Sequence, residues 1–97
     1  MRGKYFLHPQ VVCEQVAGRY FLIAFGSALE SLPYLREINE TGAFFWKKAG
    51  EGYDLSTMAG EAAGIYETSP EEMEEGLLLF FDQLERAGYV TRDETGK

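Results

Sequence analysis

The stretch INETGAFFW, residues 38–46, decides the fold of this 97-residue chain. Ile38 ends an extended apolar segment, and Asn39 is a residue type that often caps the N-terminus of a helix. The aromatic residues that follow are expected to lie on that helix. The junction therefore divides the chain into an N-terminal part made of strands and a C-terminal part made of helices.

Three extended segments precede the junction. Residues 11–16 and 19–25 are rich in β-branched and aromatic residues, and Ala17-Gly18 between them favours a hairpin turn. Residues 32–38 form the third segment. Because Pro33 lacks the N–H that a sheet ladder needs, we expect this third strand to lie at an edge of the sheet.

Three helices are predicted after the junction. The first is capped by Asn39 and runs to about Ala49. The second opens after Asp54, and its apolar face consists of residues at helical spacing: Leu55, Met58, Ala62 and Ile65. The third begins with a capping box that has proline at the first helical position, Ser69-Pro70-Glu71-Glu72.

The third helix is expected to end near Ala87, before Gly88, and residues 91–97 are expected to fray. Three strands followed by three helices predict an α+β fold with a three-stranded antiparallel sheet. The length fits a single domain, residues 1–97, with a core over about residues 11–90.

Charge and composition narrow the classes of function. The formal net charge is −7, which disfavours nucleic acid and anionic membrane surfaces as partners. No apolar run is long enough to span a bilayer, and we expect no signal peptide. Cys13 is the only cysteine, so no internal disulfide can form, and a cytoplasmic location is the simplest expectation.

The residue types of common catalytic and metal sites do not occur in the required patterns. His8 is the only histidine, which leaves no zinc ligand set. The carboxylates of Glu71 and Glu72 fit a helix N-terminus, where negative charge is favoured. We therefore expect no metal, no cofactor and no enzymatic activity from this chain on its own.

The third helix carries more apolar residues than one buried face requires. Met73, Leu77, Phe80 and Leu84 form a stripe typical of a core, with Phe81 beside it. The run LLLFF sweeps more than a full turn, so Leu78 and Leu79 lie off the stripe. Other helices or a second copy of the chain cover these two residues, or they form a wall for a partner.

The predicted edge strand, residues 32–38, adds a second feature to this wall. An open edge presents unpaired N–H and C=O groups on which another chain can add a strand. Main-chain hydrogen bonds then supply affinity, and side-chain pockets supply specificity. An edge strand beside an apolar helix is therefore a candidate peptide-binding site.

The run Ile38-Asn39-Glu40-Thr41-Gly42-Ala43, followed by Trp46, resembles the signature of the PqqD-like family, also called RiPP recognition elements. The resemblance continues over about residues 11–90. It includes Leu55, Met58, Tyr66, Ser69-Pro70-Glu71-Glu72, Leu77, Phe80, Leu84 and Gly88-Tyr89-Val90. The sequence departs from the family pattern at Arg36 and in the small residues of the second helix.

The resemblance implies a winged-helix-like fold and a protein that is not an enzyme. Such a protein binds the leader segment of a ribosomally made precursor peptide and presents it to a modifying enzyme, often a radical SAM protein. The leader adds as a strand to residues 32–38, in a cleft walled by the third helix. The implied peptide-binding residues are Leu32, Tyr34, Leu35 and Arg36 of the strand and Met73, Leu77, Leu78 and Phe81 of the helix.

Two points stay open in the sequence. Either face of strand 32–38 can line the cleft. Arg36 can pair with an acidic leader residue through a charge-assisted contact, or it can lie in solvent on the surface.

Two other functions are alternatives. A winged-helix nucleic-acid-binding regulator has a similar outline but needs a basic recognition helix. The third helix instead carries six acidic residues against the single basic residue Arg86. A homodimer that buries Leu78 and Leu79 is the other alternative, and it is compatible with peptide binding.

Overall fold

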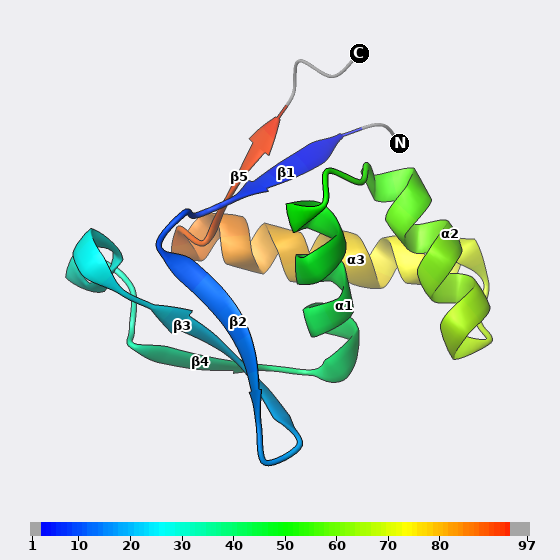
Figure 1. The fold of residues 1–97 in the computed structure, drawn as a ribbon. Helices are drawn as coiled ribbons and strands as arrows, with labels where there is room; N and C mark the ends of the chain where they lie inside the picture. The colour runs from blue at the N-terminus through cyan, green and yellow to red at the C-terminus, as the bar shows by residue number, and fades with distance from the viewer. Residues whose placement is uncertain (1–2, 94–97) are drawn as a thin grey trace.

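The computed structural model describes residues 3–93 and shows an α+β fold (Figure 1). Three strands, β2 (Val11–Val16), β3 (Arg19–Ala24) and β4 (Leu35–Ile38), form an antiparallel sheet in the order β2-β3-β4. β3 is therefore central, and β2 and β4 are the two edges. The predicted hairpin and the predicted edge position of the third strand are both confirmed.

Helices α1 (Glu40–Gly50), α2 (Leu55–Tyr66) and α3 (Pro70–Ala87) follow β4. Each begins directly after the residue predicted to cap it. The side-chain oxygen of each cap accepts a hydrogen bond from a backbone N–H in the first turn, and these caps are Asn39, Asp54 and Ser69. The switch from sheet to helix is thus located where the sequence predicts it.

The third strand is shorter than the predicted segment 32–38. A 3₁₀ helix, η1 (Gly26–Glu30), follows β3, and Leu32 then turns into the core. Its side chain lies against Gly88 at the end of α3. Because this burial and Pro33 bend the chain, the strand begins only at Leu35.

A second, two-stranded sheet was not predicted. It pairs β1 (Lys4–Leu7) with β5 (Val90–Asp93) in antiparallel orientation. The expected fraying is therefore wrong for residues 91–93, while residues 94–97 lie outside the described part of the chain. Tyr5 of β1 stacks on Phe81 of α3 with ring centroids 4.5 Å apart, and this contact anchors the small sheet to the core.

The apolar face of α2 also differs from the prediction. Ile65 is 58% exposed, although Leu55, Met58 and Ala62 are buried as expected. Small residues beside this stripe, including Ala59, are buried as well and let α2 pack closely on α3. Their burial rotates the helix so that Ile65 faces outward.

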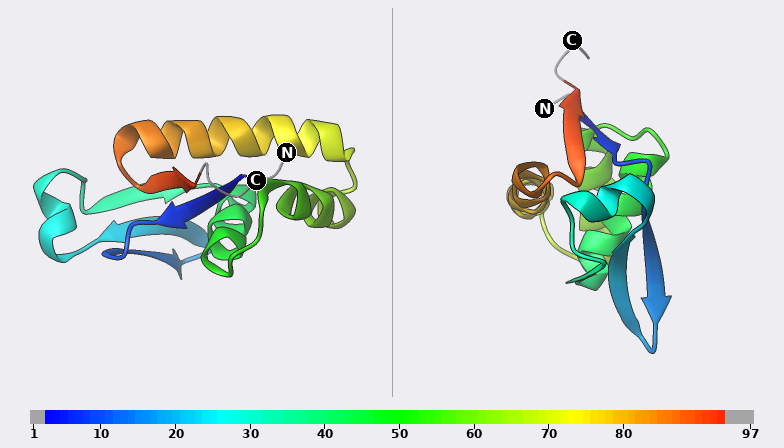
Figure 2. Two further views of the ribbon diagram at one scale, coloured as in Figure 1. Left: turned by 90° about the horizontal axis from the view of Figure 1, so that it is seen from above. Right: turned by 90° about the vertical axis from the view of Figure 1, so that its left-hand side faces the viewer.

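Different helices lie next to the two edge strands of the three-stranded sheet. Helix α1 packs on β2 and β3. Seen from above, α3 runs along the β4 side of the sheet, and β2 lies on the far side (Figure 2). None of the helices within residues 3–93 is both long and apolar enough to cross a membrane.

The core lies between the sheet and the helices. The most deeply buried large side chains come from the central strand β3, from helices α2 and α3 and from the segment after α3: Leu22, Leu55, Met58, Leu77, Phe81, Leu84 and Tyr89. This packing fixes α3 relative to β4 and so determines the space between them.

Candidate functional site

The ladder between β3 and β4 fixes which backbone groups of β4 are already used. The N–H of Ala24 donates to the carbonyl oxygen of Tyr34 at 3.0 Å. Backbone groups change sides from one residue to the next along an antiparallel strand. Arg36 and Ile38 therefore direct their N–H and C=O groups toward β3, as Tyr34 does.

Leu35 and Glu37, the alternate residues of β4, direct their N–H and C=O groups away from β3. Within the described part of the chain, β4 pairs with β3 alone. The outer rim of β4 thus offers two backbone donors and two backbone acceptors. A second chain in extended conformation has the complementary spacing.

A groove runs along α3, and it has two adjoining parts, one between β4 and α3 and one between α1 and α3. The first has a volume of about 180 Å³ and is lined by Arg36, Glu37, Ile38, Asn39, Phe80, Gln83 and Leu84. The second has a volume of about 280 Å³ and is lined by Asn39, Thr41, Gly42, Phe45, Glu72, Met73, Gly76 and Phe80. Because both parts share Asn39 and Phe80, we treat them as one feature, the α3 groove.

Two glycines shape the second part of the α3 groove. A Cβ atom at Gly42 would lie 2.7 Å from the ring of Phe80, so glycine is needed there for Phe80 to pack against α1. A Cβ atom at Gly76 would meet no other atom within 4 Å. Gly76 therefore keeps open a space that any larger side chain would enter.

Arg36 places a positive charge at the first part of the α3 groove. Its guanidinium carbon lies 5.5 Å from the centre of the Tyr89 ring, a distance suited to a cation–π interaction. Burial raises the pKa of the Tyr89 hydroxyl, and the nearby Arg36 charge opposes this rise only in part. Tyr89 therefore remains neutral, and its ring lies against the Arg36 guanidinium.

The side chain of Glu37 is engaged elsewhere. Arg19 of β3 donates two hydrogen bonds to its carboxylate, at 2.8 and 2.6 Å. This pair is exposed to solvent, and it lowers the pKa of the Glu37 carboxyl and raises the pKa of the Arg19 guanidinium. The pairing holds the Glu37 side chain toward β3 and leaves its backbone groups at the rim.

The structure places the predicted strand residues in different environments. Arg36 lines the α3 groove, and the Leu35 side chain is exposed on the opposite face of β4. Tyr34 precedes the strand and is 62% exposed. Leu32 is buried in the core and presents no surface to a peptide.

The predicted helix residues separate in the same way. Met73 lines the α3 groove, and Leu78 is half-buried against the core. Leu77 and Phe81 are fully buried, so they support the groove from behind without lining it. The unpredicted strand β1 explains the burial of Phe81, because its Tyr5 covers that ring.

Several groove residues were not identified from the sequence. Gly76, Phe80 and Gln83 lie at i, i+4 and i+7 of α3 and share one face. A glycine and a glutamine within an apolar helix are the available signal, since neither is favoured in a buried stripe. Within residues 3–93 no cluster of His, Cys, Asp and Glu has the arrangement of a metal site.

Comparisons with known proteins extend these observations. A protein-family model described as coenzyme PQQ synthesis protein D (PqqD) matches residues 33–90. Among solved structures, the chain is similar to "Lasso peptide synthetase B1 complexed with the leader peptide", with a TM-score of 0.75 and 17% sequence identity. The match covers 91% of this chain and 98% of that chain, and it shows a common fold. No curated protein sequence matches this chain.

Proposed function

This chain belongs to the PqqD family, and we propose that it is a non-catalytic protein that binds the leader segment of a ribosomally made precursor peptide. The observation that carries the proposal is the free rim of β4 beside the α3 groove. The similar solved structure, a lasso peptide synthetase B1, is complexed with a leader peptide. A shared fold and a suitable rim together support the same role here.

The leader segment adds to β4 as a fourth strand of the sheet. Its backbone exchanges hydrogen bonds with the N–H and C=O groups of Leu35 and Glu37. Every second leader side chain then points into the α3 groove. An apolar side chain fits the space beside Met73, Gly76 and Phe80, where the lining is mainly apolar.

Arg36 supplies the polar part of the recognition. Arg36 and Gln83 both line the first part of the α3 groove. A carboxylate on the leader accepts charge-assisted hydrogen bonds from this arginine. We therefore expect the bound leader to carry an acidic residue near the apolar one that enters the second part of the groove.

The bound leader is presented to a modifying enzyme. The prediction that this enzyme is a radical SAM protein rests on the resemblance to the family. A homodimer remains a further prediction, but Leu78 is half-buried against the core, so Leu79, which is 61% exposed, is the more available of the predicted pair.

The alternative of a nucleic-acid-binding regulator has less support. Helix α3 lies along the edge of the molecule and carries acidic residues on its exposed positions, including Glu71, Glu75 and Glu85. A phosphate backbone is repelled by such a surface. We therefore favour a peptide as the ligand.

The direct experiment is a titration of the purified chain into the fluorescently labelled leader segment of the precursor encoded beside it. We expect a saturable rise in anisotropy with a dissociation constant below about 10 µM. A peptide of the same composition in scrambled order is the control. Equal binding of both peptides, or no saturable binding of the leader, contradicts the proposed function.

A further inference from the structure

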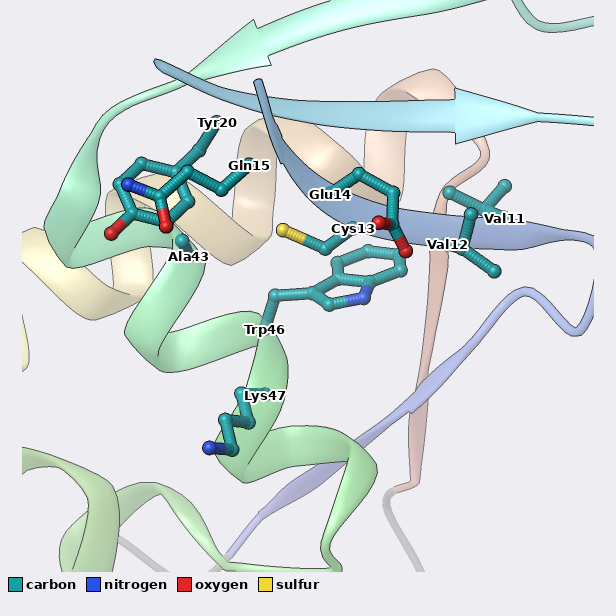
Figure 3. Close-up of a pocket in the computed structure, with 9 residues that line it drawn as sticks. All are labelled: Val11, Val12, Cys13, Glu14, Gln15, Tyr20, Ala43, Trp46 and Lys47. Atoms are coloured by element: carbon teal, nitrogen blue, oxygen red, sulfur yellow. The ribbon is translucent and has the colours of Figure 1, made fainter. Parts of the chain in front are cut away.

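The opposite edge of the sheet, β2, borders a larger hollow than the α3 groove. This hollow lies between β2 and α1 and has a volume of about 530 Å³ (Figure 3). We call it the Trp46 pocket. Its lining consists of Val11, Val12, Cys13, Glu14, Gln15, Tyr20, Ala43, Trp46 and Lys47.

The backbone of β2 has the same alternation as that of β4. The N–H of Phe25 donates to the carbonyl oxygen of Gln10 at 2.9 Å, which fixes the register of the β2–β3 ladder. Cys13 and Gln15 therefore direct their N–H and C=O groups away from β3. Among the described residues, β2 pairs with β3 alone.

The Trp46 pocket is mainly apolar next to this free rim. Trp46 is 5% exposed and Ala43 is buried, so these two α1 residues form a well-packed base for the pocket. Cys13 is half-buried, and Figure 3 shows its side chain beside the Trp46 ring. One large apolar side chain of an added strand fits between these residues, where its burial contributes to affinity.

We infer that the β2 rim and the Trp46 pocket bind an extended segment of the enzyme that modifies the precursor peptide. This inference rests on the proposed function, because a protein that presents a leader must contact the enzyme through a surface that the leader leaves free. β2 and β4 lie on opposite sides of β3. The leader at β4 and the enzyme segment at β2 can therefore bind at the same time, and each adds one strand to the sheet.

Charge determines the chemistry of the enzyme segment. Glu14 lies at the rim of the Trp46 pocket, and the whole chain carries a net charge of −7. An enzyme segment with a basic residue opposite Glu14 complements the charge of Glu14 and the net negative charge of the chain. An acidic or carboxamide side chain is the matching partner for Lys47 on the α1 side of the pocket.

The same charges disfavour a second copy of this chain at β2. Two β2 rims paired through Cys13 and Gln15 in antiparallel orientation place Glu14 of one copy opposite Glu14 of the other. Like charges that lie directly opposite destabilise a strand pair. The net charge of each copy adds to this repulsion.

Cys13 gives a direct readout, because it is the only cysteine in the chain and it lines the Trp46 pocket. Burial, with a smaller effect of the Glu14 charge, raises the pKa of its thiol. Labelling with dithiobis(nitrobenzoate) is therefore followed at about pH 9. The probe is the purified peptide-modifying enzyme encoded next to the precursor gene.

We expect a saturating amount of this enzyme to slow Cys13 labelling at least about tenfold, because an added strand covers the thiol. The leader peptide alone is expected to leave the labelling rate unchanged. Protection by the leader, protection that depends only on the concentration of this chain, or unchanged labelling with the enzyme each overturn the inference.

A pair of variants tests the rim itself. Gln15→Pro removes an outward N–H, whereas Gln15→Ala retains it and serves as the control. Gln15→Pro is expected to weaken enzyme binding at least about tenfold relative to Gln15→Ala. Both variants should bind the leader peptide as the unchanged chain does, which also shows that they are folded.

The outcomes separate this inference from the proposed function. A leader that fails to bind the unchanged chain contradicts the proposed function, whatever the enzyme does. A leader that binds normally, together with equal enzyme binding by Gln15→Pro and Gln15→Ala, overturns only the assignment of the β2 rim.

Discussion

The two edges of the sheet have the same backbone geometry but different helical neighbours. β4 borders the first part of the α3 groove; the two parts of this groove measure about 180 and 280 Å³ and include Arg36, Asn39 and Gln83. β2 faces the Trp46 pocket, which measures about 530 Å³ and has a mainly apolar floor. The free backbone groups make each edge able to accept a strand, and the neighbouring helix determines which strand fits.

Helix α1 contributes to both sites through adjacent residues. Phe45 lines the α3 groove, and Trp46 lines the pocket beside β2. Successive residues of an α-helix point about 100° apart, so neighbouring side chains reach different faces. One aromatic run at the sheet-to-helix junction therefore contributes buried rings to the lining of two different surfaces.

Gly76→Leu is expected to weaken leader binding beside β4 more than any other variant proposed here. The new side chain enters the α3 groove and displaces an apolar leader residue, whose burial is worth about 1.5–3 kcal/mol. Leader affinity should fall about 10- to 150-fold, measured by anisotropy. Gly64→Leu on α2, where a Cβ atom also has open space, is the matched control. Equal affinities of the two variants would falsify the placement of the leader in the groove.

A smaller effect is expected from Glu37→Pro, which removes one outward N–H of β4. A leader carbonyl then loses its partner, at a cost of about 1–2 kcal/mol, and affinity falls about 5- to 30-fold. Glu37→Ala removes the exposed pair with Arg19 but retains the N–H, and it should bind the leader normally. If both variants bind equally, the leader does not pair with β4.

Arg36→Gln tests the polar part of the α3 groove and is expected to have a moderate effect. Loss of a charge-assisted contact should weaken leader binding about threefold to tenfold. The salt dependence of binding should also decrease, because screening acts on the charge that has been removed. Titrations at low and high salt measure both quantities. Unchanged affinity together with unchanged salt dependence places Arg36 outside the leader contact.

Tyr89→Phe is expected to have the smallest effect. The Tyr89 hydroxyl is buried, which raises its pKa, beside the Arg36 guanidinium, which opposes this rise, but no group among the described residues meets it in good hydrogen-bond geometry. Its removal should leave the free energy of unfolding unchanged or raise it by up to about 1 kcal/mol, measured by urea denaturation. Leader affinity should not change. A clear loss of stability contradicts this account of the core beneath Arg36.

The same tyrosine predicts a dependence of stability on pH. Burial raises the pKa of folded Tyr89 above the unfolded value of 10.0. The unfolded chain therefore loses this proton first, and stability decreases as the pH rises through the unfolded and then the folded pKa. Tyr89→Phe should reduce the decrease above pH 10.0, while the contribution of Tyr5, whose pKa is also raised by burial, remains.

Local signals in the sequence predicted the elements that local chemistry determines. The caps Asn39, Asp54 and Ser69 lie where the sequence places them, because a cap bonds to an N–H three residues away. Pro33 correctly indicated an edge strand. The family resemblance is confirmed by the match over residues 33–90.

Long-range contacts account for what the sequence did not show. β1 and β5 have four residues each and lie at opposite ends of the chain, so no local pattern reveals their pairing. Their packing buries Phe81 and makes Phe80 the groove residue instead. A change of one position in the stripe of α3 thus separates a core residue from a binding residue.

The most direct test of strand addition at β4 is residue-resolved amide hydrogen exchange with and without the leader peptide. Leu35 and Glu37 should exchange at least about tenfold more slowly when the leader is bound, because only bonded amides are protected. Arg36 and Ile38 should be protected already in the free protein. Cys13 and Gln15 should not respond to the leader. Slowing at Cys13 and Gln15, or no slowing at Leu35 and Glu37, contradicts the account.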